Sequence, residues 1–274
     1  MDPLSITANV LALATVALKS SKVLYGLVDG LADAPNSVSQ TKSLLSQTQN
    51  TLGALTRTLE TSSESEPVAL GSVLEETELS KALESTNSTC QAIAATVTKF
   101  TKHSTDSHFS KRDRVAVYLQ EPRMSKLNKD LADCQRTITM VLSSVTLIVT
   151  RRASGNIDQL RTQFDAQERA LANLGTQLSA RGAAEPQAAE EDFTAQLTAS
   201  LQQVCQKTLS ATRAWRTEQK FGDMKTDDNS TAMQGIVGTA HPGVDQSFGS
   251  LTTTKSSRAF QGQMDSNAFG MLFK

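Results

Sequence analysis

The chain has 274 residues, with 27 Lys and Arg against 28 Asp and Glu and a formal net charge of −1. This near-neutral charge argues against a nucleic-acid-binding protein, whose affinity needs a surplus of basic residues. Aromatic residues make up only 4 % of the chain, which argues against a surface for base stacking, whereas 38 % hydrophobic residues suffice for the core of one or two domains.

The first predicted helix runs from about Ser5 to Leu31, with Pro3 near its start and Pro35 beyond its end. Residues 3–18 carry no charge, but no basic segment of the kind that opens a signal peptide precedes them. A membrane-spanning helix needs roughly 20 apolar residues, and polar residues interrupt this shorter run. We therefore expect a central core helix that is buried over most of its surface. Insertion into a membrane after release from the bundle is the alternative.

Two further helices are predicted before residue 103. The first begins at Asn36 as its N-cap and is followed by a loop at 61–67; the next covers about 68–102. Their apolar stripes are Val38, Leu45, Leu52, Leu55 and Leu59 in one helix and Leu79, Leu83, Cys90, Ile93, Val97 and Phe100 in the other. Thr41 and Thr48 interrupt the first stripe, which predicts a bundle of modest stability.

The fourth predicted helix has the clearest pattern, because its apolar residues alternate steps of four and three over three heptads. These residues are Leu127, Leu131, Cys134, Ile138, Val141, Val145 and Ile148. Ser154 is the expected N-cap of the fifth helix, in which Gln167 takes one position of a similar stripe formed by Ile157, Leu160, Phe164, Leu171, Leu174 and Leu178. A sixth helix is predicted over 186–220, with Phe193, Leu197, Leu201, Val204 and Trp215 on one side.

Long helices with narrow apolar stripes bury those stripes only against one another, so the sequence predicts an all-α, elongated antiparallel bundle of about six helices. Its parts would be a bundle domain at 1–181, an additional helix at 182–220 and a largely disordered tail at 221–274. The tail holds seven of the fourteen glycines. Its segments 259–263 and 267–270 could stack as strands with Asn and Gln ladders, but a flexible docking segment is the preferred interpretation.

The residues show no catalytic, cofactor or metal site. Cys90, Cys134 and Cys205 are far apart and lack a CxxC pattern, so buried, reduced thiols of a cytoplasmic protein are expected. No pattern of nucleophile and base, and no phosphate-binding loop, is present.

Other polar residues also favour structural roles. The histidines are His103, His108 and His241, and the spacing of five between the first two does not suit a metal pair on a helix. The carboxylates of Glu75, Glu76 and Glu78 are expected to form a solvated acidic face.

Charge is uneven along the chain. Residues 60–84 contain seven acidic residues and one basic residue, whereas 99–129 contain eight basic and three acidic residues. The second window holds a candidate basic patch for anionic lipid or an acidic partner, formed by Lys111, Arg112, Arg114, Arg123, Lys126 and Lys129. Mutual pairing of the two windows, within the bundle or between copies, is the favoured alternative. Ser154 follows two arginines and is a candidate phosphorylation site.

Six segments of the chain resemble known fungal helical domains. Residues 1–8 (MDPLSITA) resemble the start of a fungal N-terminal helical domain related to HeLo-like bundles. Over roughly 1–180 the chain is more similar to the domain named after azaphilone pigments biosynthesis cluster protein L. This resemblance rests on the segments 24–31 (LYGLVDGL), 46–52 (SQTQNTL), 109–114 (FSKRDR) and 134–137 (CQRT). Residues 258–264 (RAFQGQM) also resemble the segment that follows in such proteins.

The resemblance implies an all-helical, non-enzymatic domain with a link to polyketide pigment gene clusters, and it implies no catalytic residues. We therefore expect a cytoplasmic accessory protein that acts as a scaffold, a regulator or a self-associating module. It would bind a protein partner or its own copies, with no cofactor or nucleic acid, and the sequence identifies no small-molecule substrate. One alternative is a HeLo-like membrane-targeting or signalling module that uses the first helix and the 99–129 window. An unrecognised biosynthetic enzyme is the other alternative.

Overall fold

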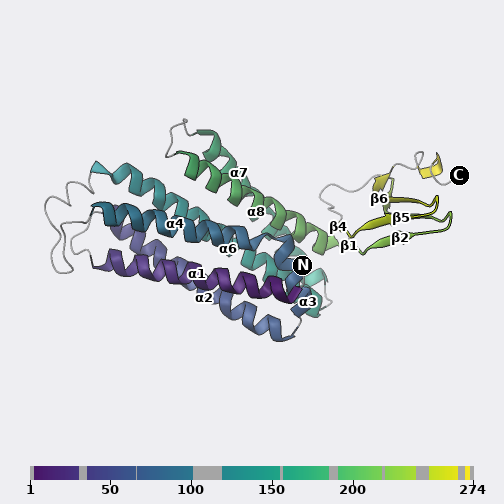
Figure 1. Cartoon of the computed structure of the whole chain (residues 1–274), viewed down its shortest axis with the longest axis horizontal. Coiled ribbons are helices and arrows are strands. Elements are labelled where there is room, and N and C mark those ends of the chain that lie inside the picture. The colour runs from purple at the N-terminus through teal and green to yellow at the C-terminus, as the bar shows by residue number, and fades with distance from the viewer. Residues whose placement is uncertain are drawn as a thin grey trace.

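The computed structural model describes residues 3–30, 36–65, 67–100, 119–154, 157–184, 191–217, 220–238, 247–264 and 269–271. Long helices dominate the described chain, as Figure 1 shows, and the predicted all-α fold class is confirmed. The helices are α1 (Pro3–Asp29), α2 (Asn36–Ser65), α3 (Pro67–Glu76), α4 (Leu79–Phe100), α6 (Glu121–Ser154), α7 (Ile157–Ala184) and α8 (Glu191–Thr217).

Four helices form the body of the bundle. Helix α1 packs against α2 and α4, and α6 packs against the same two helices on the opposite side, so the four surround a shared core. The α7–α8 pair lies against α6, and α8 also reaches α4. The short α3 contacts one end of α1 and α2 (Figure 1).

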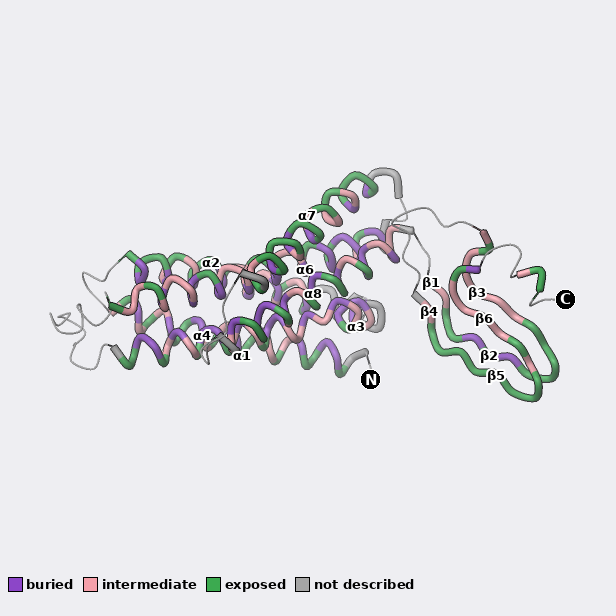
Figure 2. Tube along the Cα trace, turned by 90° about the horizontal axis from the view of Figure 1, so that it is seen from above, coloured by how far each residue is buried: buried purple, intermediate pink, exposed green. Residues whose placement is uncertain are grey.

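The predicted apolar stripes form this core. All seven residues of the α6 stripe are buried, and Figure 2 shows the buried positions lying on the inner sides of the helices. Near one end of the bundle, Leu24, Leu45, Ile93 and Leu131 meet from α1, α2, α4 and α6. A separate cluster joins α6 to the α7–α8 pair through Cys134, Leu174, Leu178, Leu197, Leu201 and Cys205. Burial of these stripes supplies the main driving force for folding.

Two predicted boundaries are wrong. Most of the expected loop at 61–67 is helical, since α2 continues to Ser65. The expected single helix at 68–102 is divided, because Glu78 has a φ of 50° and interrupts the helix between α3 and α4. Thr77 closes the end of α3 by donating its hydroxyl to the Val73 carbonyl at 3.0 Å, and Lys81 contacts the Glu78 carboxylate at 2.9 Å.

The prediction that α1 is buried over most of its surface is also wrong. Among the described helices, α1 is the one that is long and apolar enough to span a membrane. Only 28 % of its most apolar 18-residue stretch is buried inside the bundle. Residues such as Val10 and Leu24 face the core, whereas Val16 and Val23 are 48 % and 65 % exposed. The reason is the position of α1 at the outside of the bundle, where α2, α3 and α4 cover one side of it.

Threonine occupies many core positions. The hydroxyls of Thr41 and Thr48, both fully buried, contact the carbonyls of Ser37 and Leu44, four residues earlier in α2. Thr41 also lies 2.7 Å from Oδ1 of the buried Asn128 of α6. The two threonines therefore differ, because the Thr48 hydroxyl serves its own helix and the Thr41 hydroxyl joins two helices.

This difference predicts opposite effects of the same substitution. Thr48→Val removes a buried hydroxyl that bonds an already paired carbonyl, and should raise the free energy of unfolding by up to about 1 kcal/mol. Thr41→Val removes the hydroxyl that donates a hydrogen bond to the buried Asn128 Oδ1. This loss should lower the free energy of unfolding by about 1–3 kcal/mol. Urea unfolding followed by circular dichroism measures both effects. Equal changes in the two variants would contradict the assigned roles.

The C-terminal segment contains strands where a largely disordered tail was predicted. They are β1 (Lys220–Phe221), β2 (Met224–Thr226), β3 (Thr231–Val237), β4 (Ser247–Phe248), β5 (Leu251–Thr253) and β6 (Arg258–Met264). The pairs β1–β4, β2–β5 and β3–β6 are all parallel and share a sequence offset of 27 residues. We call 220–237 rung 1, 247–264 rung 2, and the two together the strand unit. It lies beyond the end of the bundle at which α8 finishes (Figures 1 and 2).

Candidate functional site

The candidate basic patch is only partly visible. Lys111, Arg112 and Arg114 lie outside the described residues, while Arg123, Lys126 and Lys129 occupy the first turns of α6. Lys129 is exposed. Burial raises the pKa of the Asp130 carboxyl, one turn after Lys126, and the charge of Lys126 acts in the opposite direction. Binding of anionic lipid by this window stays a prediction.

The other predicted polar positions do not come together. His103, His108 and His241 lie outside the described residues. Ser154 is the last residue of α6 and α7 begins at Ile157, so the prediction that Ser154 caps the next helix is wrong; its phosphorylation stays a prediction. Among the residues that the structure describes, no group of three or more His, Cys, Asp or Glu is arranged to hold a metal ion.

The three cysteines are reduced and buried, as predicted. Burial raises the pKa of the Cys90 and Cys134 thiols to about 12 and that of Cys205 to about 11. Cys134 lies 3.7 Å from the Thr89 hydroxyl, in the contact between α6 and α4. Because the thiolate is the nucleophile, these thiols are chemically inert at neutral pH.

A thiol titration checks this conclusion. In the native protein at pH 7 to 8, Cys90, Cys134 and Cys205 should react with an aromatic disulfide reagent more slowly by at least about a hundredfold than in denaturant, because burial limits both access and thiolate formation. The time course of released chromophore, with and without denaturant, is the measurement. A thiol that reacts at the unfolded rate in the native protein would show that its helix contact opens readily.

The predicted acidic face is partly engaged in packing. Glu75 is exposed, but Glu76 Oε2 accepts a hydrogen bond from Trp215 Nε1 at 3.3 Å. Glu78 Oε1 likewise accepts one from Gln203 Nε2 at 3.4 Å. These contacts attach the α3–α4 junction to α8, so the assignment of the carboxylates to a purely solvated face is corrected.

A buried ionic cluster joins α6, α7 and α8. Arg181 of α7 donates to Asp130 and Asp133 of α6, and Thr194 of α8 lies 3.3 Å from Asp130 Oδ2. The Asp130 side chain has no exposed surface, and Arg181 is 18 % exposed. Burial raises the pKa of Asp130, while Arg181 acts in the opposite direction. Both carboxylate oxygens of Asp130 contact donors, which indicates a structural role.

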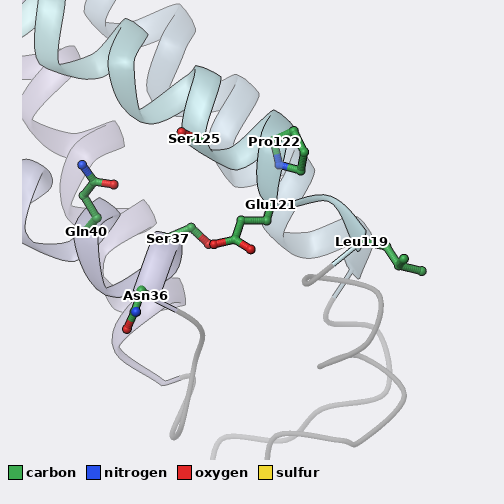
Figure 3. Close-up of a pocket in the computed structure, with 7 residues that line it drawn as sticks. All are labelled: Asn36, Ser37, Gln40, Leu119, Glu121, Pro122 and Ser125. Atoms are coloured by element: carbon green, nitrogen blue, oxygen red, sulfur yellow. The ribbon is translucent and has the colours of Figure 1, made fainter.

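An open depression of about 580 Å³ lies between the first turns of α2 and α6. Figure 3 shows Ser37 and Glu121 pointing toward each other across it, with Pro122 and Leu119 on the α6 side. Below it, Asn128 Nδ2 donates to the Ser37 carbonyl at 2.8 Å and fixes the two helices together. Among the described residues, the side chains that line the depression include one carboxylate, that of Glu121, and no basic group.

The strand unit contains the most regular polar arrangement of the described chain. The rings of Phe221 and Phe248 stack with their centroids 5.0 Å apart, and Gln261 Nε2 donates to Gln234 Oε1 at 3.0 Å. Asp223 Oδ1 accepts a hydrogen bond from the Ser250 backbone N–H at 2.7 Å, which lowers the pKa of Asp223. Equivalent residues of the two rungs therefore contact one another along the whole unit.

The tail was predicted to be largely disordered, although its sequence contains a signal of this arrangement. Rungs 1 and 2 are identical at seven of their eighteen aligned positions, which include the pairs Phe221–Phe248, Gln234–Gln261 and Gly235–Gly262. Comparing the tail with itself at an offset of 27 residues would have revealed the repeat.

The family comparison concerns the bundle. A family model described as "Pigment biosynthesis cluster protein PigL N-terminal" matches residues 1–183, which include α1 to α6 and nearly all of α7. No curated protein and no solved structure matches the chain. The match ends before α8, so the strand unit lies outside the matched region.

Proposed function

Since the chain belongs to the family of pigment biosynthesis cluster protein PigL N-terminal domains, we propose that it is a non-enzymatic accessory protein of a fungal polyketide pigment cluster. It acts in the cytoplasm by binding other protein chains. The resemblance to the azaphilone cluster protein supports the pathway, and the buried, reduced cysteines support a reducing compartment.

The chemistry of the bundle supports a role without catalysis. Several ionisable groups of the described bundle have structural contacts. They are the three buried thiols, the Asp130–Arg181 cluster, and Glu168, which Arg213 and Arg216 contact at 3.3 and 2.5 Å. These contacts stabilise the packing of α7 and α8 on α6. The bundle therefore serves as a platform that carries the strand unit.

The open edges of the strand unit carry the proposal. Each of its three sheets has two strands, so within the described residues every strand has one edge with unpaired backbone groups. Unpaired strand edges are templates for another chain. Such edges, at the end of a helical bundle, are the feature expected of an interaction protein.

Deletion of the gene in a pigment-producing fungus, followed by metabolite profiling, tests the proposed function. An accessory protein should change the amount or distribution of pigments without accumulation of one defined intermediate. The full-length chain should restore the pigments, and a chain ending at residue 218 should not. An unchanged profile would refute the pathway association, and accumulation of a single intermediate would support the enzyme alternative.

A membrane-targeting module is the second candidate, and the exposed side of α1 favours it. Val16 and Val23 lie seven residues apart on an apolar helix and are largely exposed. If this surface enters a bilayer, the Val16→Asp, Val23→Asp double variant should lose vesicle binding and keep its helical content. Sedimentation with anionic vesicles over a range of salt concentrations measures this. Absence of wild-type binding at low salt would exclude the candidate.

A further inference from the structure

We propose that the strand unit assembles head to tail with the strand unit of a second copy of this chain. Rung 2 of one copy would stack on rung 1 of the next, so that the parallel ladders continue from chain to chain along a filament. This inference rests on the proposed role as an interaction protein, and it identifies both the partner and the mode of contact.

The two rungs follow the same backbone path. Residues in the left-handed region recur at equivalent positions: Asp228 and Lys255 have φ values of 54° and 50°, and Asn229 and Ser256 have 56° and 63°. Gly235 and Gly262, also equivalent, have 141° and 130°. The outer edge of rung 2 therefore has the shape that rung 1 presents inside the chain, and a further rung 1 fits against it.

The side-chain contacts can also repeat across the junction. In a head-to-tail stack, Gln261 of one copy would meet Gln234 of the next, as these residues already meet within the chain at 3.0 Å. Phe248 would likewise stack on the next Phe221, which extends a pair of rings whose planes are nearly parallel, at 8°. Ladders of amides and stacked aromatic rings stabilise in-register parallel assemblies.

The opposite charges of rung 1 and rung 2 favour a second copy of this chain as the partner, and they favour head-to-tail stacking. Rung 1 contains Asp223, Asp227 and Asp228 against two lysines, whereas rung 2 contains Lys255 and Arg258 and no acidic residue. Within the chain, Lys255 Nζ lies 3.3 Å from Asp227 and 3.5 Å from Asp228. Head-to-tail stacking brings these same opposite charges together at every junction, whereas stacking of rung 1 on rung 1 would oppose aspartates. Such a contact does not close on itself and produces an open filament.

The glycines of the strand unit show which positions face a neighbouring rung. A Cβ on Gly249 of rung 2 would lie 2.5 Å from Asp223 Oδ1 and 2.7 Å from the Gly222 carbonyl carbon, so this position faces rung 1. The equivalent Gly222 has nothing within 4 Å of its Cβ position in the single chain. Because the rungs follow the same path, Gly222 would face rung 2 of the preceding copy in the filament. A methyl group there would clash only after assembly.

Electron microscopy and X-ray fibre diffraction of the purified full-length chain provide the first test. Filaments should form above a critical concentration and show a repeat of about 4.8 Å along the axis. Gly222→Ala should raise the critical concentration about tenfold or more and leave the circular dichroism spectrum of the dilute protein unchanged. The matched variant Gly26→Ala, also with open space around its Cβ position, should assemble as the wild type does. A wild-type chain that stays monomeric, or a Gly222→Ala chain that assembles normally, would overturn the proposal.

Disulfide trapping tests the direction of stacking. Gln234→Cys and Gln261→Cys are made as separate chains, and the native thiols stay buried. Under mild oxidation the mixture should give a cross-linked dimer that contains one chain of each kind. Each variant alone should give little, since like positions are two rungs or about 9.6 Å apart, beyond the reach of a disulfide. Equal cross-linking in each variant alone would overturn head-to-tail stacking.

The proposed function and this inference can fail separately. A purified chain that stays monomeric, together with pigment loss in the deletion strain, overturns the inference and leaves the function standing. Filaments and the mixed cross-link, together with an unchanged pigment profile, support the inference and refute the pathway role.

Discussion

Leu131→Asp should abolish the cooperative unfolding of the helical bundle. Leu131 has no exposed surface and packs with Leu24, Leu45 and Ile93 in the core cluster that joins four helices. The substitution would place a carboxylate in this apolar cluster, directly beside the buried Asp130. Burial of an unpaired charge costs several kcal/mol, a large part of the about 5–15 kcal/mol that stabilises a typical domain. Thermal unfolding followed by circular dichroism should show a broad, low-amplitude change.

Two variants of the same helix separate charge from packing. Leu131→Ala keeps the site apolar and should lower the free energy of unfolding by about 2–5 kcal/mol through the cavity that it creates. Lys129→Asp, at an exposed position two residues earlier, should change it by less than about 0.5 kcal/mol. A Leu131→Asp protein that melts cooperatively at the wild-type temperature would contradict the assignment of this position to the core.

The α6 core could be predicted because its information is local. Steps of four and three place one residue of every helical turn on the same side, and a narrow apolar side can be buried only against other helices. All seven stripe residues, from Leu127 to Ile148, are buried as expected. The division between α3 and α4 could not be predicted in this way, since Glu78 adopts a positive φ without a glycine or proline to indicate it.

The position of α1 and the buried ionic cluster depend on how helices pack, which local periodicity does not report. An apolar helix can occupy the centre or the outside of a bundle, and exposure of Val16 and Val23 follows from which neighbours it has. Arg181 and Asp130 are 51 residues apart, and their contact requires a particular register of α7 on α6. In the sequence, each of these two residues resembles an ordinary charged residue on the exposed side of a helix.

The strand unit was mispredicted for a different reason. Four of the six described strands have only two or three residues, and most strand residues are not buried. All three residues of β5 are exposed, for example, so no clear alternation of apolar and polar residues indicates the strands. A composition rich in Gly, Ser and Thr is typical of disordered segments. The structural information lies in the similarity of two segments 27 residues apart, which a search for periodicity within short windows does not detect.

Arg181→Met should lower the free energy of unfolding by about 3–5 kcal/mol at neutral pH, because it leaves the Asp130 carboxylate buried without its counter-ion. Thr194 and Lys126 are the other groups that act on Asp130, and neither replaces the two bonds that Arg181 makes to Asp130 and Asp133. Methionine fills most of the volume of the arginine stem, so the loss reports charge more than packing. Arg136→Met is the control, because Arg136 pairs with Asp133 at 3.5 Å but is 58 % exposed, and it should cost less than about 1 kcal/mol.

The pH dependence of the Arg181→Met variant identifies the cause of its instability. Burial already raises the pKa of Asp130 above the ordinary value of 3.8, and loss of Arg181 should raise it further. A carboxyl with a raised pKa in the folded state is easier to ionise in the unfolded chain, so the penalty is absent below about pH 4 and grows as the pH rises above it. Urea unfolding at several pH values should therefore show the variant approaching wild-type stability in acid. Asp130→Asn in the same background should recover part of the loss at neutral pH, whereas a pH-independent loss without such recovery would assign the effect to packing.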